Sequence, residues 1–197
     1  KNGGRGMVRA IDLLGDRLFI GGQFNGVEMN GGPVKPAPNT YEVNAITGLV
    51  GGWRPQTNGT VFDIDASDRG DRVYIAGWFT TINNIGGELY ATRISDGAPL
   101  TNFHWLRTWS GSSGTYNQTV HEVGDQVFIG GREHFFSAYD RNTGARTQAN
   151  LTVQGGDFQD AESAFGYMFG ACHCSGNDAV NLSGRTLYTG NNRTLDN

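Results

Sequence analysis

The sequence contains little charge and almost no lysine. Charged residues make up 17% of the 197 residues, and two lysines and thirteen arginines stand beside nineteen acidic residues, for a net charge of −4. Nucleic acids and anionic membrane surfaces are bound through a basic electrostatic field, which this chain lacks. We therefore expect no nucleic-acid partner.

Long apolar runs are also absent. No segment approaches the roughly 20 apolar residues that a membrane-spanning helix requires, and the first residues, 1–4, read KNGG rather than a secretory signal. No long apolar stretch follows the 3.6-residue period of a helix. We expect almost no helix and no membrane insertion, and we expect the chain to be a mature or internal piece of a longer protein.

Glycine, in contrast, is abundant. The chain has 31 glycines in 197 residues, roughly twice the average usage of about 7%. With 37% hydrophobic and 11% aromatic residues it can still build a packed core. This combination favours short strands joined by many tight turns over a helical bundle.

An apolar motif that ends in glycine recurs along the chain. The segments 18–24, 73–79 and 127–132 read LFIGGQF, VYIAGWF and VFIGGR, and a polar Gly-Asp turn precedes each of them. A further short strand candidate lies ahead of each turn. The pattern therefore predicts a repeated pair of strands joined by a hairpin turn.

The copies of this motif are evenly spaced. The central aromatic residues of the first three copies, Phe19, Tyr74 and Phe128, lie 55 and 54 residues apart. A shorter fourth copy is predicted at 167–172, with Met168 in the aromatic position 40 residues after Phe128. Such regular spacing is typical of a repeat architecture.

A second glycine turn runs in step with the first motif. Gly48, Gly97 and Gly144 end Thr-Gly or Asp-Gly turns and lie 49 and 47 residues apart. One unit therefore contains four short strands, which is the pattern of a β-propeller blade. A β-sandwich is the alternative, but its strands would not keep two motifs in phase. We predict an all-β fold, a β-propeller of four-stranded blades, with blade-like units at 1–58, 59–117, 118–156 and 157–197.

These residues resemble a known repeat family. The segments 18–24 and 73–80, the Thr-Gly turns and Trp53-Arg54-Pro55 are similar to the delta-60 type β-propeller repeats. The resemblance covers about 1–147, whereas 148–197 departs from the pattern. It implies a ring of about seven blades, of which about four would be present here, and a scaffolding role in secreted or cell-surface bacterial proteins. A closed four-bladed ring is the alternative.

The side chains after each Gly-Gly element differ in charge, size and chemistry. In a propeller, the loop after the second strand of each unit opens on one face of the ring, and such loops are free to diversify. We therefore predict that one face carries these side chains and binds a protein or carbohydrate partner. The alternative is that they differ only because loops vary. The predicted binding residues are Gln23, Trp78, Arg132, Glu133, His134, Cys172 and His173.

The tripeptide Cys172-His173-Cys174 is the most unusual in the chain. In an extended strand its two sulfur atoms point to the same side. A structural thiol or disulfide is the favoured interpretation. The alternative is a metal site in which Cys172 and Cys174 bind zinc together with a further donor such as His134. We expect no cofactor, with zinc or calcium as the alternative.

The acidic segment 63–71 superficially resembles a calcium loop. The EF-hand pattern requires glycine at its sixth position, where this segment has Asp68, so a strand followed by a turn is favoured. Five Asn-x-Ser/Thr sequons permit N-glycosylation in a secretory host. They lie at Asn58, Asn117, Asn150, Asn181 and Asn192.

No nucleophile motif and no phosphate-binding glycine loop can be identified in the sequence. We therefore predict a non-catalytic, secreted or cell-surface propeller that acts as a binding or assembly scaffold. One alternative is a propeller enzyme that acts on a polysaccharide or uses a metal at the ring centre. Another is a self-assembling structural subunit of a surface layer, filament or appendage.

Overall fold

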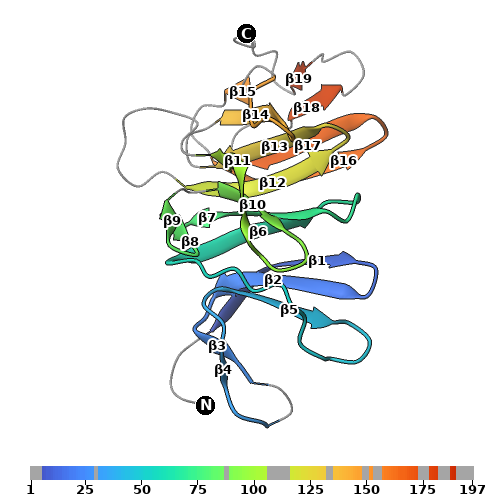
Figure 1. Cartoon of the computed structure of the whole chain (residues 1–197). Coiled ribbons are helices and arrows are strands. Elements are labelled where there is room, and N and C mark those ends of the chain that lie inside the picture. The colour runs from blue at the N-terminus through green and yellow to red at the C-terminus, as the bar shows by residue number, and fades with distance from the viewer. Residues whose placement is uncertain are drawn as a thin grey trace. The chain divides into compact units, whose positions relative to one another are not determined.

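The computed structural model describes residues 6–28, 31–86, 89–105, 116–131, 135–147, 151–152, 157–172, 178–181 and 187–189. All regular structure in these ranges is β-strand (Figure 1). No helix in them could cross a membrane. The chain divides into two units, Lys1–Leu106 and Arg107–Asn197.

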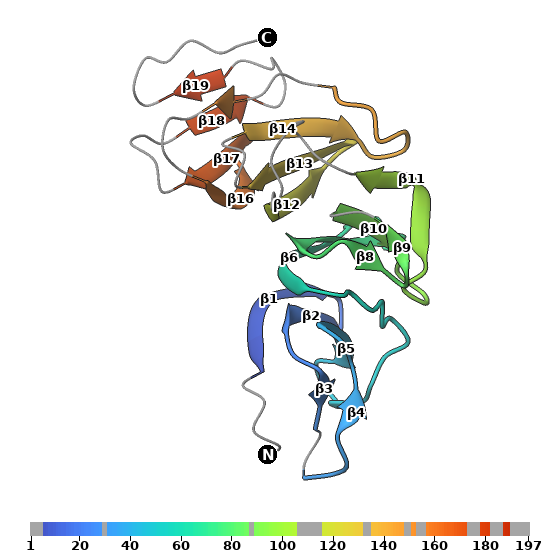
Figure 2. The same ribbon diagram turned by 90° about the vertical axis from the view of Figure 1, so that its left-hand side faces the viewer.

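The first unit contains two antiparallel sheets. In the first sheet, β1 (Met7–Leu14), β2 (Arg17–Gln23) and β5 (Thr40–Asn44) lie side by side (Figure 2). A single bridge between Val43 and Val50 stands where a fourth strand would follow. The second sheet has four strands in chain order. They are β6 (Thr60–Ala66), β7 (Arg72–Trp78), β10 (Leu89–Arg93) and β11 (Pro99–Trp105).

Two small hairpins interrupt these sheets after their second strands. One is formed by β3 (Gly26–Val27) and β4 (Lys35–Pro36), and the other by β8 (Thr81–Ile82) and β9 (Ile85–Gly86). Each hairpin follows the glycine motif directly. In the first two sheets, the loops that the sequence predicts after the second strands therefore carry short strands of their own.

The second unit repeats the arrangement of the first. Its two sheets are four-stranded and follow chain order. The third sheet consists of β12 (Asn117–Val123), β13 (Gln126–Gly131), β14 (Phe135–Asp140) and β15 (Leu151–Thr152). The fourth consists of β16 (Phe158–Ala164), β17 (Tyr167–Cys172), β18 (Asp178–Asn181) and β19 (Leu187–Thr189).

The second glycine of the repeated motif is required by the backbone. A Cβ atom on Gly22, Gly77 or Gly131 would lie only 2.0–2.3 Å from a carbonyl oxygen of the facing strand. At this point the register of the paired first strand shifts in each sheet, which is the signature of a β-bulge. The motif therefore marks a close backbone approach that recurs in three sheets.

The predicted turn glycines also adopt the backbone conformation that turns require. Gly48, Gly97 and Gly144 have φ angles of 69°, 75° and 69°, a left-handed region that costs glycine little. The side chain of Asn44 accepts hydrogen bonds from two backbone N–H groups of the first turn, and Asp140 does the same in the third sheet. These turns confirm the second repeated motif.

The fourth copy of the motif is shifted by one residue from the sequence prediction. The hairpin turn pairs Ala164 with Tyr167, so Phe169 and not Met168 occupies the position of Phe19. The sequence alignment was wrong because it matched Gly170 to the first glycine of the motif, which the pairing places at Ala171. Cys172 consequently corresponds to Gly22 and not to Gln23.

The first two sheets pack face to face around an aromatic and aliphatic core. Phe19 meets Trp53 edge to face, with their ring centroids 5.2 Å apart, and the second sheet contributes Val61, Ile64 and Val73. The bulge after Val61 changes the alternation of β6, so that Val61 and Ile64 face the same side despite their odd spacing.

The core of the second unit is built from stacked phenylalanines. The ring centroids of Phe128 and Phe136 lie 5.6 Å apart, and those of Phe136 and Phe158 lie 5.1 Å apart. Met168 is fully buried in the same cluster. Antiparallel meanders packed face to face in sequence are the blades of a β-propeller, which confirms the predicted all-β fold class.

Candidate binding site

Two of the predicted binding residues occupy matching positions in the first unit. Gln23 is the last residue of β2 and pairs with Met7, and Trp78 is the last residue of β7 and pairs with Thr60. Both side chains are exposed, and 58% of Trp78 is accessible to solvent. We call Gln23, Trp78 and the loop residues 24–28 and 79–86 the strand-end site.

Asparagine side chains fix the loops around these positions. Asn58 accepts hydrogen bonds from the backbone N–H groups of Thr80 and Thr81, at 2.8 and 2.9 Å, and its amide nitrogen donates to the Thr80 hydroxyl. Asn39 accepts from the N–H of Phe24 at 3.1 Å and donates to the Thr57 carbonyl. Because side chains hold the loops on both sides, the strand-end site is organised before any ligand binds.

Sequence reasoning missed this role of asparagine. Asn39, Asn83 and Asn84 adopt positive φ angles of 66°, 48° and 65°, and asparagine is one of the few residues other than glycine that tolerates this conformation. Asn83 also accepts from the N–H of Gln56 and donates to the Gly97 carbonyl. Asparagines at the predicted loop boundaries were the signal that could have identified these contacts.

Cys172 does not share the exposure of Gln23 and Trp78. It packs partly buried against the phenylalanine core of the second unit and is disulfide-bonded. A disulfide sulfur is not the thiolate that binds zinc, so a metal site there would first require reduction. The other predicted binding and metal residues, Arg132, Glu133, His134, His173 and Cys174, lie outside the described residues. A single face for all seven residues stays a prediction.

The predicted glycosylation sites differ in their surroundings. Asn58 is exposed, but its amide nitrogen already donates to Thr80. Asn117 is only 5% exposed within β12, where a glycan would find no room. Asn181 ends β18, and Asn150 and Asn192 fall outside the described ranges.

The acidic segment that resembles a calcium loop forms a strand and a turn. Asp63 lies within β6, and its carboxylate accepts a hydrogen bond from the N–H of Ile64 at 2.9 Å. Gly70 has a φ angle of 70° in the turn that follows. Within the part of the chain that the structure describes, no three His, Cys, Asp or Glu side chains are placed to hold a metal ion.

An ion pair with a buried carboxylate helps to connect the two sheets of the first unit. Arg17 Nε lies 2.6 Å from Glu42 Oε1, and Arg17 also donates to the Ile94 carbonyl of the second sheet. The backbone N–H of Trp53 donates to the other Glu42 oxygen, and the Trp53 indole donates to the Thr92 hydroxyl, each at 2.8 Å. These contacts give Glu42 a structural role because both its oxygens are satisfied within the fold.

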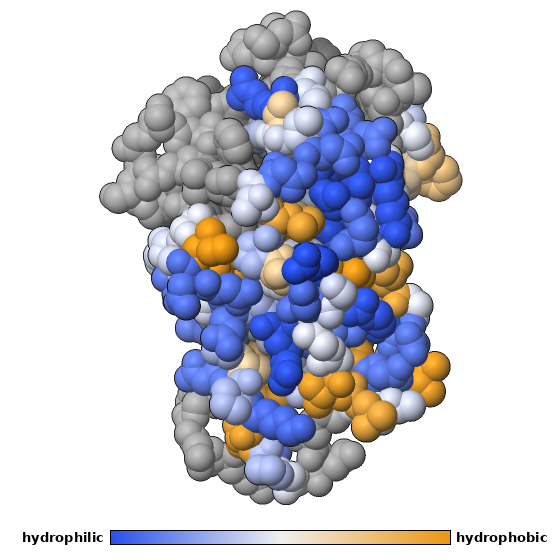
Figure 3. All heavy atoms as spheres, viewed as in Figure 1, coloured by the Kyte–Doolittle hydropathy of each residue, from blue (hydrophilic) through white to orange (hydrophobic). Residues whose placement is uncertain are grey.

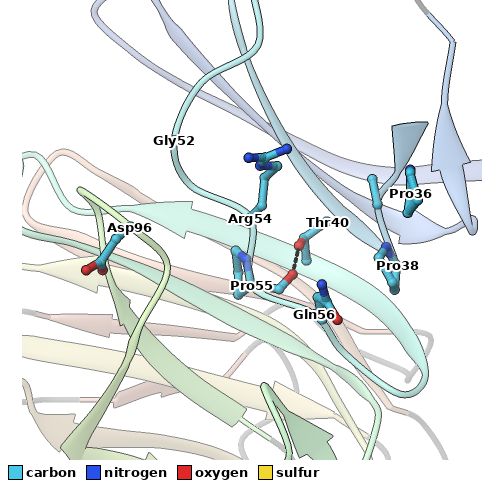
Figure 4. Close-up of a pocket in the computed structure, with 9 residues that line it drawn as sticks. Pro36, Pro38, Thr40, Gly52, Arg54, Pro55, Gln56 and Asp96 are labelled. Atoms are coloured by element: carbon cyan, nitrogen blue, oxygen red, sulfur yellow. Dashed lines mark hydrogen bonds between the residues drawn. The ribbon is translucent and has the colours of Figure 1, made fainter. Parts of the chain in front are cut away.

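A concavity lies at the side of the first two sheets (Figure 4). It has a volume of about 380 Å³, and the Thr40 hydroxyl donates to the Pro55 carbonyl at its wall. A hydrogen bond from Arg93 lowers the pKa of Asp96, the acidic residue of this pocket. Sequence reasoning missed the pocket because its wall combines three separate segments, represented by Pro36, Arg54 and Asp96.

Solved structures with the same architecture match this chain at low sequence identity. BamB from Moraxella catarrhalis is 16% identical, with a TM-score of 0.61 over 93% of this chain and 49% of its own. The WD40 repeats of RRP9 are 7% identical, with a TM-score of 0.64 over 95% and 52%. The designed Ika4 protein is 10% identical, with a TM-score of 0.58 over 95% and 92%.

This chain therefore spans about half the length of the BamB and RRP9 chains that it matches. No protein-family model and no curated protein sequence matches it. At these identities the likeness concerns the fold alone. Together with the blade architecture of the described sheets, it shows that the chain has a β-propeller fold.

Proposed function

We propose that this chain is a non-catalytic β-propeller, secreted or displayed on a cell surface, that binds a protein or carbohydrate partner at the strand-end site. The proposal rests above all on the exposure of Trp78 at the end of β7. Tryptophan is enriched among the residues that dominate binding interfaces, because its rigid ring offers a large contact area at little entropic cost.

The surroundings of Trp78 support this role. The residue before it, Gly77, is fixed by a close backbone approach, and Asn58 holds the loop that follows. The matching position in the first sheet carries Gln23, a polar residue. A constant framework that presents different side chains is what a recognition surface requires.

Two further observations support the predicted location and the absence of catalysis. The disulfide at Cys172 suits an oxidising compartment such as the cell exterior. The ion pairs Arg17–Glu42 and Arg141–Glu122 have closest distances of 2.6 and 3.0 Å, and the carboxylate of each pair is only 5% exposed. They leave these carboxylates occupied in the interior.

The proposal is tested by comparing partner binding of two surface variants with that of the wild type. Immobilised wild type is screened against a glycan array and, separately, against extracellular proteins. Trp78→Ser should weaken binding of the captured partner at least about tenfold. The matched control is Ile46→Ser. Ile46 is 83% exposed in the turn that follows β5, at the end of the first sheet opposite to Gln23.

Ile46→Ser should bind as the wild type does, and both variants should keep the wild-type circular dichroism spectrum. Equal binding by wild type and Trp78→Ser would contradict the proposed site. Absence of any partner in both screens would contradict the binding function itself.

A further inference from the structure

The pocket at the side of the first two sheets offers a positive charge to a ligand. Arg54 lines it and is exposed, and within the described part of the chain no group accepts a hydrogen bond from its guanidinium. The acidic residue of the pocket, Asp96, already accepts hydrogen bonds from Arg93 at 2.9 and 3.0 Å. Figure 4 shows its side chain directed away from Arg54. The negative charge of Asp96 is thus matched by Arg93, and Arg54 is left for an anion.

The backbone presents a second polar side chain beside Arg54. Trp53 and Pro55 are buried, whereas Arg54 and Gln56 are exposed, and both exposed residues line the pocket. The backbone N–H of Gln56 donates to the Asn83 side chain, and its carbonyl accepts from the Asn83 N–H, each at 2.8 Å. Because buried neighbours and these bonds hold the segment, Arg54 and Gln56 are positioned before a ligand arrives.

The charge of the pocket favours a carboxylate. A guanidinium offers parallel N–H donors that match the two oxygens of a carboxylate or two oxygens of a phosphate. Among the described residues that line this pocket, Arg54 is the only cation. A single cation balances the one charge of a carboxylate, whereas a phosphate carries nearly two. The chain as a whole has a net charge of −4, so an anion depends on this local contact.

The remaining lining suits a hydroxylated ligand. The Gln56 amide both donates and accepts hydrogen bonds, as a hydroxyl group does, and it has no partner among the described residues. Pro36, Pro38 and Pro55 add apolar C–H surface to the wall. Hydrophilic residues also cover much of the molecular face in Figure 3. A ligand with a carboxylate, hydroxyls and a C–H face would use all of these groups.

We propose that this pocket binds the uronate unit of an acidic carbohydrate, with its carboxylate on Arg54 and a hydroxyl on Gln56. The volume of about 380 Å³ lies near the lower end of the roughly 300–1,000 Å³ of ligand clefts, which suits one small unit. Neither residue belongs to the strand-end site, so the inference does not rest on binding at Trp78.

Isothermal titration calorimetry of the whole chain with galacturonate and with oligogalacturonate tests this inference. Neutral galactose should bind at least about tenfold more weakly than galacturonate, because it lacks the charge-assisted contact. Arg54→Gln should lower the affinity for galacturonate by the same factor, and Gln56→Ala should lower it severalfold. The matched control is Arg146→Gln, which changes an exposed arginine outside the pocket and should leave the affinity unchanged.

Binding of either acidic probe that depends on Arg54 supports the inference, and the tighter probe shows whether the unit is free or part of a polymer. Equal affinity for galacturonate and galactose would overturn it. So would tighter binding of galactose 6-phosphate or of a peptide through its C-terminal carboxylate. Equal losses in Arg54→Gln and Arg146→Gln, or no binding of either acidic probe at millimolar concentration, would also overturn it.

Discussion

The two pairs of sheets share one backbone design but fill their interiors differently. In each pair, a first strand carries a bulge opposite the end of the second strand, with the same close approach at Gly77 and Gly131. The first pair is joined by Trp53 and its hydrogen bonds, whereas the second is filled by stacked rings around Phe136. The repeated glycines and turns therefore specify the blade, and the side chains between blades can be exchanged.

Among the proposed changes, truncation of Trp53 should have the largest effect on the unfolding free energy and should act on only one of the two pairs of sheets. Trp53→Ala removes a fully buried ring that packs on Phe19 and makes two hydrogen bonds. We expect the first unit to lose about 3–5 kcal/mol of unfolding free energy. Urea denaturation followed by hydrogen exchange should show that the first unit unfolds earlier than in the wild type.

The matched change in the other pair is Phe158→Ala, which removes a fully buried ring from the phenylalanine stack. It should lower the unfolding free energy of the second unit by about 3–5 kcal/mol and leave that of the first unit unchanged. Identical unfolding profiles for Trp53→Ala and Phe158→Ala would contradict the separate filling of the two interiors.

Alanine substitution of a motif glycine should have the next largest effect. A Cβ at position 77 would lie 2.2 Å from the Thr60 carbonyl oxygen, so Gly77→Ala forces the two strands apart. We expect a loss of about 2–3 kcal/mol, measured by urea denaturation. Gly70→Ala is the control, because Gly70 has a positive φ angle but nothing within 4 Å.

Gly70→Ala should cost only about 1 kcal/mol, the conformational cost of a left-handed alanine. If Gly70→Ala proves as destabilising as Gly77→Ala, the result would contradict a special cost of the close approach at Gly77, because Gly77 is not among the glycines with a positive φ angle.

The turn between β16 and β17 offers a stabilising change. Phe165 has a φ angle of 53° and is 96% exposed, so its ring contributes no burial to offset the left-handed backbone. Phe165→Gly should raise the unfolding free energy of the second unit by about 1 kcal/mol, measured by thermal unfolding. Phe165→Ala keeps the strained backbone and should give no such gain. Equal effects of the two variants would argue against backbone strain at this turn.

The smallest expected effect is on the stability of the second unit at acidic pH. Hydrogen bonds from the backbone N–H groups of Thr143 and Asn142 lower the pKa of Asp140 below its ordinary value. A carboxylate whose pKa is lowered in the folded state stabilises the fold at pH values above its unfolded-state pKa. This contribution disappears as the pH falls through the folded-state pKa. Asn44 forms the same contacts in the first sheet without a charge.

Asp140→Asn should therefore keep the turn while removing this acid dependence. Thermal unfolding between neutral pH and about pH 3 should show a shallower decline for the variant than for the wild type. An unchanged decline would mean that other carboxylates account for the acid response of the second unit.

Sequence reasoning found the parts of the fold that backbone geometry dictates. Gly22 and Gly77 could be identified because a close approach tolerates only glycine, and Gly48 because its turn needs a positive φ angle. The fourth copy was misaligned by one residue. There Ala171 and Cys172 replace the glycine pair, and the sequence alone does not show where a strand bulges.

The candidate site was predictable only in part. Gln23 and Trp78 could be matched because their distance from a repeated motif is constant. The loop contacts of Asn39 and Asn58 depend on segments that approach each other only after folding. The burial of Cys172 against the phenylalanine core likewise follows from packing and not from spacing.

Hydrogen–deuterium exchange of the wild-type chain, with and without its captured partner, tests the central claim most directly. Partner binding should protect the strand-end site, in the loops that follow Gln23 and Trp78. Protection confined to the turns at Gly48 and Gly97, or to the pocket at Arg54, would place recognition elsewhere and contradict the account.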